Sequence, residues 1–371
     1  MKLLLVSSAP LIFKESKVFA YSPYVNEMAI WSKYATISFA CVEWKEPNGL
    51  LISEIPFEIE RFFKLADFNI KSKKNIFSAF FNSIANIFIL MKAMKTADHI
   101  HLRCPGNMAL LGCIAQIFFP RKIKTAKYAG NWDKNSMQPL SYRIQKWILS
   151  NTFFTKNMQV LVYGEWKNES KNIKPFFTAT YSESDKISVL KRNLGETIKF
   201  VFVGTLSSGK RPLYVLELLN KLHKKVHNVQ IDFYGEGVER KNLENYILEN
   251  NLSEIAFLHG NQNEMVVRNA YQKSHFLVLP SKSEGWPKVV AEAMFWGCVP
   301  ISSPVSCVPN MLDNGNRGIL LSLEIEKDTA SIFDLLQNEQ SYFEKSLAAE
   351  NWSRKYTLDT FEAEIKKLLQ S

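Results

Sequence analysis

The chain has few cysteines, and they are scattered. Its 371 residues contain five, at Cys41, Cys104, Cys113, Cys298 and Cys307, and none forms a C-x-x-C pair. An odd and dispersed set excludes a disulfide framework and gives no zinc-ligand spacing. We therefore expect free thiols in a reducing compartment.

Long hydrophobic runs are also missing. The longest apolar-rich stretch, residues 76–91, is interrupted by Asn82, Ser83 and Asn86. It is shorter than the roughly 20 residues that a membrane-spanning helix requires. The apolar core near the start, residues 3–6, is shorter than the roughly 7–15 residues of a secretory signal. We expect a first buried strand there, no leader and no transmembrane helix.

Acidic residues are scarce in the first half only. The net charge is +10. Residues 1–185 contain 24 Lys/Arg and 14 Asp/Glu, whereas residues 186–371 contain 22 of each. This asymmetry indicates an anionic partner for the first half, such as a membrane surface, a phosphorylated acceptor or nucleic acid. A generally basic, solubilising surface is the alternative.

Strand-like and helix-like runs alternate along both halves, which predicts parallel sheets covered by helices. In the first half we expect strands at 2–6, 35–42, 98–102, 123–128 and 158–163, and helices at 23–33, 74–94, 107–119 and 140–150. The polar segment 164–186 interrupts the rhythm. It then restarts with strands at 198–203, 229–234, 255–259, 275–279, 298–301 and 318–321, and helices at 212–224, 239–249, 266–273, 287–296 and 357–369. The predicted fold class is α/β, with two doubly wound domains.

The most informative stretch follows the strand at 275–279. Glu284 and Glu292 have seven residues between them, the first in a loop and the second inside the helix. Pro287 suits the first helical position, and Gly285 allows close backbone approach. The free N–H groups of the first turn would then lie beyond the carboxyl end of a strand, where open α/β sheets bind ligands.

Two further turns accompany this stretch. After the strand at 198–203, Gly204 is followed by Lys210 and Arg211 just before a helix, a combination that suits a diphosphate. The sequence Gly235-Glu236-Gly237 has Arg240 where a dinucleotide fingerprint has its third glycine. A nicotinamide cofactor is therefore not expected, and a tight strand-to-helix turn is the simpler interpretation.

Together these motifs resemble family 4 of the retaining GT-B glycosyltransferases. The stretch 283–294 resembles the family's E-x7-E signature, and the spacing from Gly204 to Lys210 resembles its glycine-to-lysine loop. The G-x-G turn at 235–237 and the loop 302–310 follow in the family's order. The resemblance covers about residues 204–321. The first half resembles the family only in its strand–helix rhythm.

The resemblance implies a fold of two Rossmann-like domains facing across a cleft. Residues 1–185 would bind the acceptor and residues 186–355 the nucleotide-sugar, with 356–371 as a C-terminal helix that can cross back to the first domain. Lys210 would neutralise the donor diphosphate, Glu284 would bind sugar hydroxyls, and Glu292 the ribose. The other implied donor-binding residues are Gly204, Thr205, Arg211, Gly235, Gly237, Gly285, Trp286, Pro287, Lys288 and Val289.

The resemblance also implies a cofactor-free reaction. No D-x-D sequence occurs in the chain, and a GT-B site uses lysine and helix dipoles instead of a metal. The expected activity is transfer of a sugar from a nucleotide-sugar to a glycan or lipid-linked saccharide in cell-surface polysaccharide synthesis. A UDP-sugar is the favoured donor, and a GDP-sugar is the next candidate. The expected location is cytoplasmic, with contact to the inner face of the cell membrane as an option.

Several positions depart from the family pattern. Thr205 stands where many relatives have a phosphate-binding arginine, a role that Arg211 can take over. Ser306-Cys307 replaces paired glycines. The segment 127–132 stands where several relatives have a histidine near the reaction centre. This chain has no histidine there, so the contact that such a histidine makes is absent or falls to Asn131 or another group. The loop 8–18 lacks a glycine pair, and Lys14 and Lys17 are expected to face the cleft instead.

Two features of the first half have competing interpretations. The segment 61–95 interleaves basic residues with phenylalanines, which is typical of a helix on anionic lipid, although a helix with its Phe face on the sheet gives the same pattern. Its residues are Arg61, Phe62, Phe63, Lys64, Asp67, Phe68, Lys71, Lys73, Lys74, Phe77, Phe80, Phe81, Phe88, Lys92 and Lys95. His99 and His101 are expected on opposite sides of a strand, with His101 or Arg103 as candidates to reach the cleft.

Three other classes of function compete with a glycosyltransferase. A GT-B-like epimerase is disfavoured by the E-x7-E stretch, and a phosphorylase by the lack of an evident cofactor-binding lysine. A non-catalytic nucleic-acid binder is suggested by charge alone, and the basic half has no recognisable nucleic-acid motif. No nucleic-acid partner is therefore expected.

Overall fold

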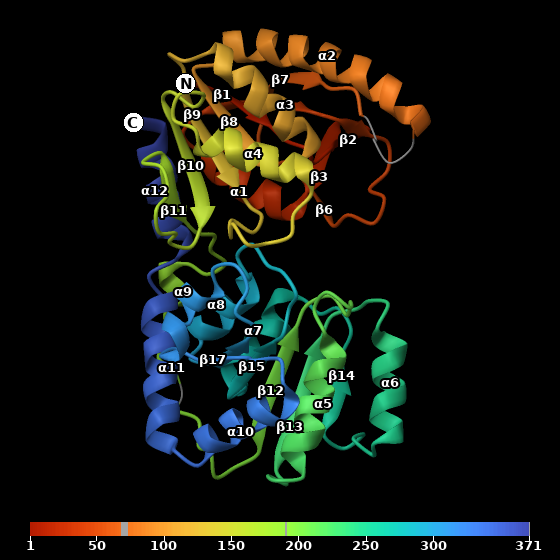
Figure 1. The fold of residues 1–371 in the computed structure, drawn as a ribbon, viewed down its shortest axis with the longest axis vertical. Coiled ribbons are helices and arrows are strands. Elements are labelled where there is room, and N and C mark those ends of the chain that lie inside the picture. The colour runs from red at the N-terminus through yellow and green to blue at the C-terminus, as the bar shows by residue number, and fades with distance from the viewer. Residues whose placement is uncertain (68–72, 190, 371) are drawn as a thin grey trace. The chain divides into compact units, whose positions relative to one another are not determined.

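The computed structural model describes residues 1–67, 73–189 and 191–370, with the backbone alone at 73–78. The chain divides into two compact units (Figure 1). Unit 1 consists of Met1–Phe176 together with the chain from Glu362 onward, and unit 2 of Phe177–Phe361. The expected boundary at residue 185 falls inside unit 2.

Unit 1 is built on a seven-stranded sheet, counted over the described residues, in the order β11-β10-β9-β8-β1-β4-β7. Every pairing in it is parallel. Its strands are β1 (Lys2–Val6), β4 (Thr36–Cys41), β7 (Ile59–Lys64), β8 (His99–Cys104), β9 (Ile123–Tyr128), β10 (Met158–Tyr163) and β11 (Ile173–Phe176). Because the central strands are covered on both faces, β1 and β8 are apolar or buried along nearly their whole length.

Helices cover both faces of this sheet. The helices α2 (Lys73–Thr96), α3 (Asn107–Ala115) and α4 (Leu140–Ser150) lie side by side on one face (Figure 1). Their buried side chains share one core with Leu4, Val6, Ile100 and Leu102. The helix α1 (Ser22–Ser32) packs on the other face, where the Trp31 ring lies 4.5 Å from that of His101. A short 3-10 turn, η1 (Gln116–Phe118), extends α3.

A small sheet with four strands among the described residues, in the order β5-β2-β3-β6, was not expected from the sequence. It contains β2 (Leu11–Lys14), β3 (Lys17–Tyr21), β5 (Glu43–Trp44) and β6 (Ile52–Glu54). The predicted loop 8–18 is therefore mostly a hairpin. Lys14 pairs with Glu46 at 3.2 Å and Lys17 with Glu54 at 2.7 Å. Both lysines are exposed and paired on this sheet, and their place in a cleft stays a prediction.

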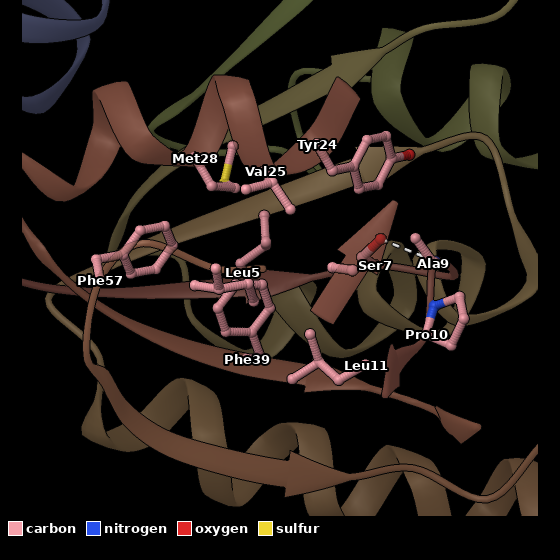
Figure 2. Close-up of a pocket in the computed structure, with 12 residues that line it drawn as sticks. Leu5, Ser7, Ala9, Pro10, Leu11, Tyr24, Val25, Met28, Phe39 and Phe57 are labelled. Carbon is pink, nitrogen blue, oxygen red and sulfur yellow. Dashed lines mark hydrogen bonds between the residues drawn. The ribbon is translucent and has the colours of Figure 1, made fainter. Parts of the chain in front are cut away.

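Beneath the hairpin lies an apolar pocket (Figure 2). Leu5, Phe39, Val25 and Met28 line it, and the Ser7 hydroxyl at its rim accepts a hydrogen bond from the Ala9 amide at 3.0 Å. Its volume is about 10 Å³, which is room for a single water molecule. This pocket is a packing defect of the core and is too small for a saccharide.

The strand β8 corrects two predictions. The His99 Nε2 and His101 Nδ1 atoms both bond the Thr125 hydroxyl, at 2.8 and 2.7 Å. The two histidines therefore face the same side, as residues two apart on a strand must, and the prediction of opposite faces is wrong. Both are fully buried. Arg103 is buried as well and pairs with Glu27 at 2.5 Å, so neither candidate extends to the solvent.

Unit 2 has a six-stranded sheet, again counted over the described residues, in the order β14-β13-β12-β15-β16-β17, with every pairing parallel. Its strands are β12 (Ile198–Val203), β13 (Val229–Tyr234), β14 (Ala256–Leu258), β15 (Phe276–Leu279), β16 (Val299–Ser302) and β17 (Ile319–Leu320). Its helices are α5 (Pro212–His223), α6 (Arg240–Glu249), α7 (Glu264–Lys273), α8 (Lys288–Phe295), α9 (Val308–Met311), α10 (Ile325–Leu336) and α11 (Glu339–Ser353), with 3-10 turns η2 (Glu183–Asp185) and η3 (Asp313–Gly315).

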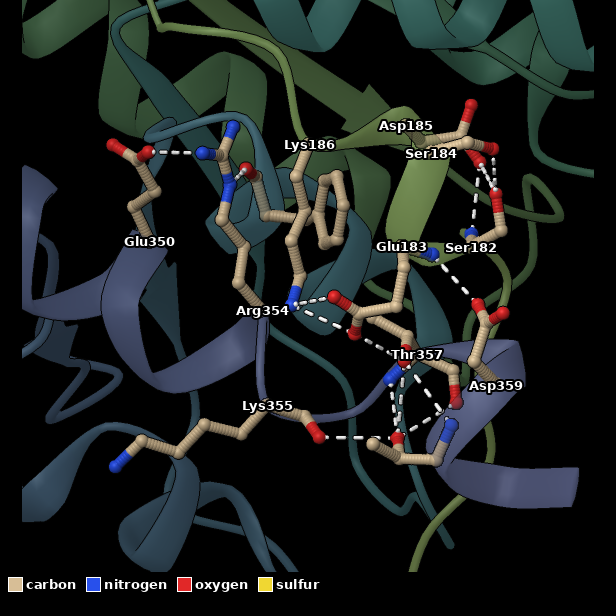
Figure 3. Close-up of polar contacts among 12 residues, drawn as sticks. Ser182, Glu183, Ser184, Asp185, Lys186, Glu350, Arg354, Lys355, Thr357 and Asp359 are labelled. Carbon is tan, nitrogen blue, oxygen red and sulfur yellow. Dashed lines mark hydrogen bonds and ion pairs between the residues drawn. The ribbon is translucent and has the colours of Figure 1, made fainter. Parts of the chain in front are cut away.

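The ends of unit 2 are tied together by polar contacts (Figure 3). The Glu183 carboxylate accepts from the Thr357 hydroxyl at 2.8 Å, and the Glu183 amide donates to Asp359 at 2.7 Å. These bonds hold η2 against the start of the last helix, α12 (Leu358–Gln370). Further along α12, within unit 1, Glu362 accepts from the Tyr34 hydroxyl at 2.7 Å.

Candidate functional site

The candidate site lies at the carboxyl edge of the unit 2 sheet. From β12 the chain continues to β13 and β14 on one side, and then to β15, β16 and β17 on the other. The loops after β12 and β15 therefore diverge at a topological switch point, where open α/β sheets bind ligands. Lys210 stands in the first loop and Glu284 in the second.

These two side chains form an ion pair. The Lys210 Nζ atom donates to Glu284 Oε1, with 29% and 10% of the two side chains exposed. The loops are also joined by their backbones, since the Lys282 amide donates to the Gly209 carbonyl at 2.8 Å. The structure thus brings together the two residues that the sequence placed in the reaction.

The glycines of the neighbouring turn have a packing role. An added Cβ at Gly235 would lie 2.0 Å from the Gly204 carbonyl oxygen, and one at Gly237 would lie 2.2 Å from that of Leu206. The loops after β12 and β13 are hydrogen-bonded here, from the Gly204 amide to Tyr234 and from the Leu206 amide to Glu236, each at 2.9 Å. The G-x-G turn therefore lets one loop pass directly against the other.

Arg211 and Thr205 differ in their environment. Arg211 has φ of 51° and precedes α5, whose first residue is Pro212. Its guanidinium donates to the Pro280 carbonyl at 3.1 Å, so it braces the end of β15. Thr205 is exposed at the tip of its loop. This bond uses one of the five guanidinium N–H donors, so a role of Arg211 as a replacement phosphate ligand is compatible with its contact to Pro280.

The helix α8 begins one residue later than predicted. Pro287 is the N-cap, with ψ of 91°, and the helix starts at Lys288. The prediction of Pro287 as the first helical residue is wrong, although its carbonyl still accepts from the Val290 amide at 3.0 Å. The N–H groups of Lys288 and Val289, at the start of this helix, precede the first intrahelical bond and are available to an anion.

The side chain of Trp286 packs into the protein. It is 9% exposed, and its ring lies 6.0 Å from that of Trp352 and 5.7 Å from that of Tyr356. It anchors the loop to the end of α11. Because its side chain is buried, Trp286 would contact a nucleotide-sugar through its backbone. The neighbouring Gly285 has no side chain to prevent such a close approach.

A set of side-chain donors that the sequence did not predict holds this loop. Ser302 Oγ donates to the Leu279 carbonyl at 2.9 Å, and Ser303 Oγ donates to that of Ser281. The Gly285 carbonyl accepts from Ser306 Oγ at 3.0 Å and from Cys307 Sγ at 3.2 Å. Ser306-Cys307, the departure from paired glycines, thus fixes the backbone between the two glutamates.

Glu292 lies on α8 among hydroxyl groups. Its Oε1 accepts from Thr180 Oγ1 at 2.7 Å and its Oε2 from the Tyr271 hydroxyl at 3.2 Å. Burial raises the pKa of this carboxyl, and the Thr180 hydrogen bond opposes that shift. Thr180 is 112 positions away in the chain, and no local sequence signal identifies it. A carboxylate keeps further acceptor sites, so this pair positions Glu292 for additional hydroxyls.

No group of three or more His, Cys, Asp or Glu side chains suited to a metal ion occurs in the part of the chain that the structure describes. Among the same residues, no helix combines the length and apolarity needed to cross a bilayer. The positive groups at the site include Lys210, Arg211 and the N-terminus of α8.

The fold is α/β and of the GT-B type. Residues 185–352 match the model of the family described as glycosyl transferases group 1. The fold is similar to that of the lipopolysaccharide outer core galactosyltransferase WaaB, with a TM-score of 0.73 and 15% identity, over 100% of this chain and 99% of that one.

Two curated proteins are similar over part of the chain. An uncharacterized glycosyltransferase of Methanocaldococcus jannaschii is 28% identical over 37% of this chain and 39% of its own length. An α-1,4-N-acetyl-D-galactosaminyltransferase of Campylobacter jejuni, named for a saccharide on PP-undecaprenol, is 26% identical over 38% of this chain and 39% of its own. The matched region therefore spans well under half of each relative.

Proposed function

We propose that this protein is a retaining glycosyltransferase that transfers a sugar from a nucleotide-sugar to a glycan or lipid-linked saccharide. The observation that carries the proposal is the Lys210–Glu284 pair at the switch point of the unit 2 sheet. A cation and a carboxylate held beside a free helix N-terminus match the two ends of such a donor, its diphosphate and its sugar hydroxyls.

The proposed chemistry depends on the leaving group. The bond from the anomeric carbon to the diphosphate oxygen breaks, and the acceptor hydroxyl forms the new bond on the same face while its proton passes to the departing phosphate. Lys210 and the amides of Lys288 and Val289 would stabilise the charge on the diphosphate, which is the dominant catalytic effect for such a step. Glu284 would orient the sugar, and Glu292 the ribose.

This assignment gives the Lys210–Glu284 pair a function in the free protein. Donor binding would separate the two side chains, because the lysine turns to phosphate and the carboxylate to hydroxyl groups. Each side chain keeps a charged or polar partner in both states, so neither is left buried and unpaired. The ion pair thus stabilises the empty site, and the exchange of partners lets the nucleotide-sugar bind.

We further propose that the donor is a UDP-sugar, with a GDP-sugar as the next candidate, and that turnover needs no metal. We place the reaction in cell-surface polysaccharide synthesis at the cytoplasmic side of a membrane. The lipid-linked acceptor is supported by the name of the Campylobacter jejuni relative. Metal independence rests on the cations already at the site, Lys210 and Arg211.

The test is a panel of UDP- and GDP-sugars, with thermal shift for binding and nucleoside diphosphate release for turnover, in buffer with excess EDTA. We expect stabilisation by one donor and product release that persists in EDTA. Product with inverted anomeric configuration by NMR would contradict retention. Conversion of the donor sugar without nucleotide release would indicate an epimerase, and dependence on inorganic phosphate a phosphorylase.

A further inference from the structure

Two helices of unit 1 carry apolar stripes that point away from the sheet. On α2 the exposed residues are Phe80, Phe81, Ile84 and Phe88, with exposed fractions of 61%, 54%, 39% and 68%. On α4 they are Leu140, Ile144 and Trp147, at 69%, 39% and 61%. Their spacing of three and four residues places each set along one side of its helix.

The two stripes belong to the same side of the molecule. The opposite sides of both helices, including Leu90 and Met94 of α2 and Ile148 and Leu149 of α4, are buried in one core. Figure 1 shows α3 between α2 and α4, and on α3 Leu110 and Ile114 are partly exposed. We call the exposed side of these three helices the α2–α4 face.

Acidic residues are missing from this face. No Asp or Glu occurs in residues 73–96, 107–118 or 140–150, whereas Lys92, Lys95 and Arg143 are exposed there. In a protein with 36 acidic residues, three neighbouring helices without one leave an apolar surface with positive charge alone. Such a surface is complementary to a partner that is apolar inside and anionic outside.

A groove rich in lysine adjoins this face. It has a volume of about 780 Å³, lies at the amino ends of β9, β10 and β11, and is lined by Lys124, Lys156, Lys171 and Lys174. Thr152, Thr155, Asn157 and Asn172 add hydrogen-bonding groups, and none of its lining residues is acidic. We call it the lysine groove.

Aromatic rings connect the groove to the α4 stripe. The Lys156 Nζ atom lies 5.5 Å from the centre of the Phe153 ring, which is 72% exposed. The Phe153 and Phe154 rings lie 5.6 Å apart, and the Phe154 and Trp147 rings 5.5 Å apart. Apolar anchors and cationic groups thus form one continuous surface.

We propose that the α2–α4 face and the lysine groove together dock on an anionic phospholipid bilayer. The exposed rings of Phe88 and Trp147 enter the headgroup–acyl boundary. The three exposed lysines of the groove, Lys156, Lys171 and Lys174, bind lipid phosphate groups. A second copy of the chain is a poorer occupant, because pairing this face with itself would bring like charges together. The sequence indicated an anionic partner for the first half and a lipid contact at residues 61–95, of which Phe68 and Lys71 lie outside the described residues. The tertiary structure adds α4 and the groove.

Vesicle co-sedimentation of the full chain tests this proposal without any donor or acceptor. We expect binding to vesicles of phosphatidylcholine with phosphatidylglycerol, weak binding to phosphatidylcholine alone, and loss of binding as salt is raised. The double variant Phe88→Ser/Trp147→Ser should lower the partition coefficient by at least about tenfold. The triple variant Lys156→Glu/Lys171→Glu/Lys174→Glu should abolish the preference for anionic vesicles.

Matched controls come from unit 2. Val238 and Leu248 are 86% and 69% exposed, and Lys224, Lys241 and Lys273 are exposed lysines. Val238→Ser/Leu248→Ser and Lys224→Glu/Lys241→Glu/Lys273→Glu should bind like the parent. Equal losses of binding in these controls, or no vesicle binding by the folded parent, would overturn the proposal. It would also be overturned if the parent were a dimer through this face, with Phe88→Ser/Trp147→Ser giving a monomer and neither form binding vesicles.

This outcome is separable from the proposed enzymatic function. Glu284→Gln should bind vesicles like the parent, because the substitution is confined to unit 2. If vesicles bind and no nucleotide-sugar does, the glycosyltransferase assignment fails while the docking surface stands. If a nucleotide-sugar is turned over and vesicles do not bind, the docking surface fails alone.

Discussion

Lys210 and Glu284 form an ion pair that connects the loop after β12 to the loop before α8. Each residue partly shields the other from solvent. Removal of one partner therefore has two effects: it removes that residue's contact with a ligand, and it leaves the charge of the other residue without its partner.

Lys210→Ala is expected to lower kcat by about 100- to 1,000-fold, the range seen when one donor to a developing negative charge is lost. Glu284→Gln keeps the shape of the side chain but loses its charge, and it should also lower turnover. Nucleoside diphosphate release by both variants is the measurement, with Lys282→Ala as the control because Lys282 is exposed in the same loop. Full turnover by Glu284→Gln would remove the role assigned to that carboxylate.

Gly235→Ala should destabilise the protein by at least about 2 kcal/mol, because its Cβ would collide with the Gly204 carbonyl and its φ is 143°. Gly209→Ala is the matched control in the adjacent loop, where an added Cβ has the Ser207 hydroxyl as its nearest neighbour at 3.8 Å. Urea unfolding of both variants measures the difference. Equal midpoints would show that the two loops are free to separate.

The Ser306→Ala/Cys307→Ala variant tests the clamp on the Gly285 carbonyl. Loss of both donors should cost about 1–3 kcal/mol of stability and raise the KM for the donor more than it lowers kcat, because the clamp positions a backbone and does not touch reacting atoms. Ser331→Ala is the control, since its hydroxyl donates to a carbonyl on an exposed part of α10 at 3.0 Å. A kcat effect with unchanged KM would contradict this positioning role.

The stability of unit 2 should fall as the pH drops from about 6.5 to about 4. Burial lowers the pKa of His275 to about 4, so the unfolded chain binds a proton in this window and the folded chain does not. The difference amounts to about 3 kcal/mol at most. Denaturant unfolding at several pH values should show a shallower decline for His275→Gln and an unchanged one for His227→Gln, whose side chain is exposed. Parallel curves for all three proteins would exclude His275 as a source of the effect.

Local sequence signals predicted the α/β fold, the alternation of elements and the two loops of the candidate site. They did so because strand and helix periodicity, Gly204, Pro212 and the spacing of Glu284 and Glu292 are local properties of the chain. Helix ends shifted by a residue or two, as with Pro287. The pairs Lys14–Glu46 and Lys17–Glu54 were missed because they depend on a small sheet whose short strands have little periodicity.

By itself, the sequence determined the fold class of this protein and the loops of its candidate site, because a strand, a loop with a cation and a helix start with two carboxylates are encoded within short segments. Only the tertiary structure decided which groups meet. It paired Lys210 with Glu284, brought Thr180 to Glu292, and placed the exposed rings of α2 and α4 on one side of a shared core. These contacts join segments far apart in the chain, and their geometry is fixed by the packing of helices on parallel sheets, which no local pattern specifies.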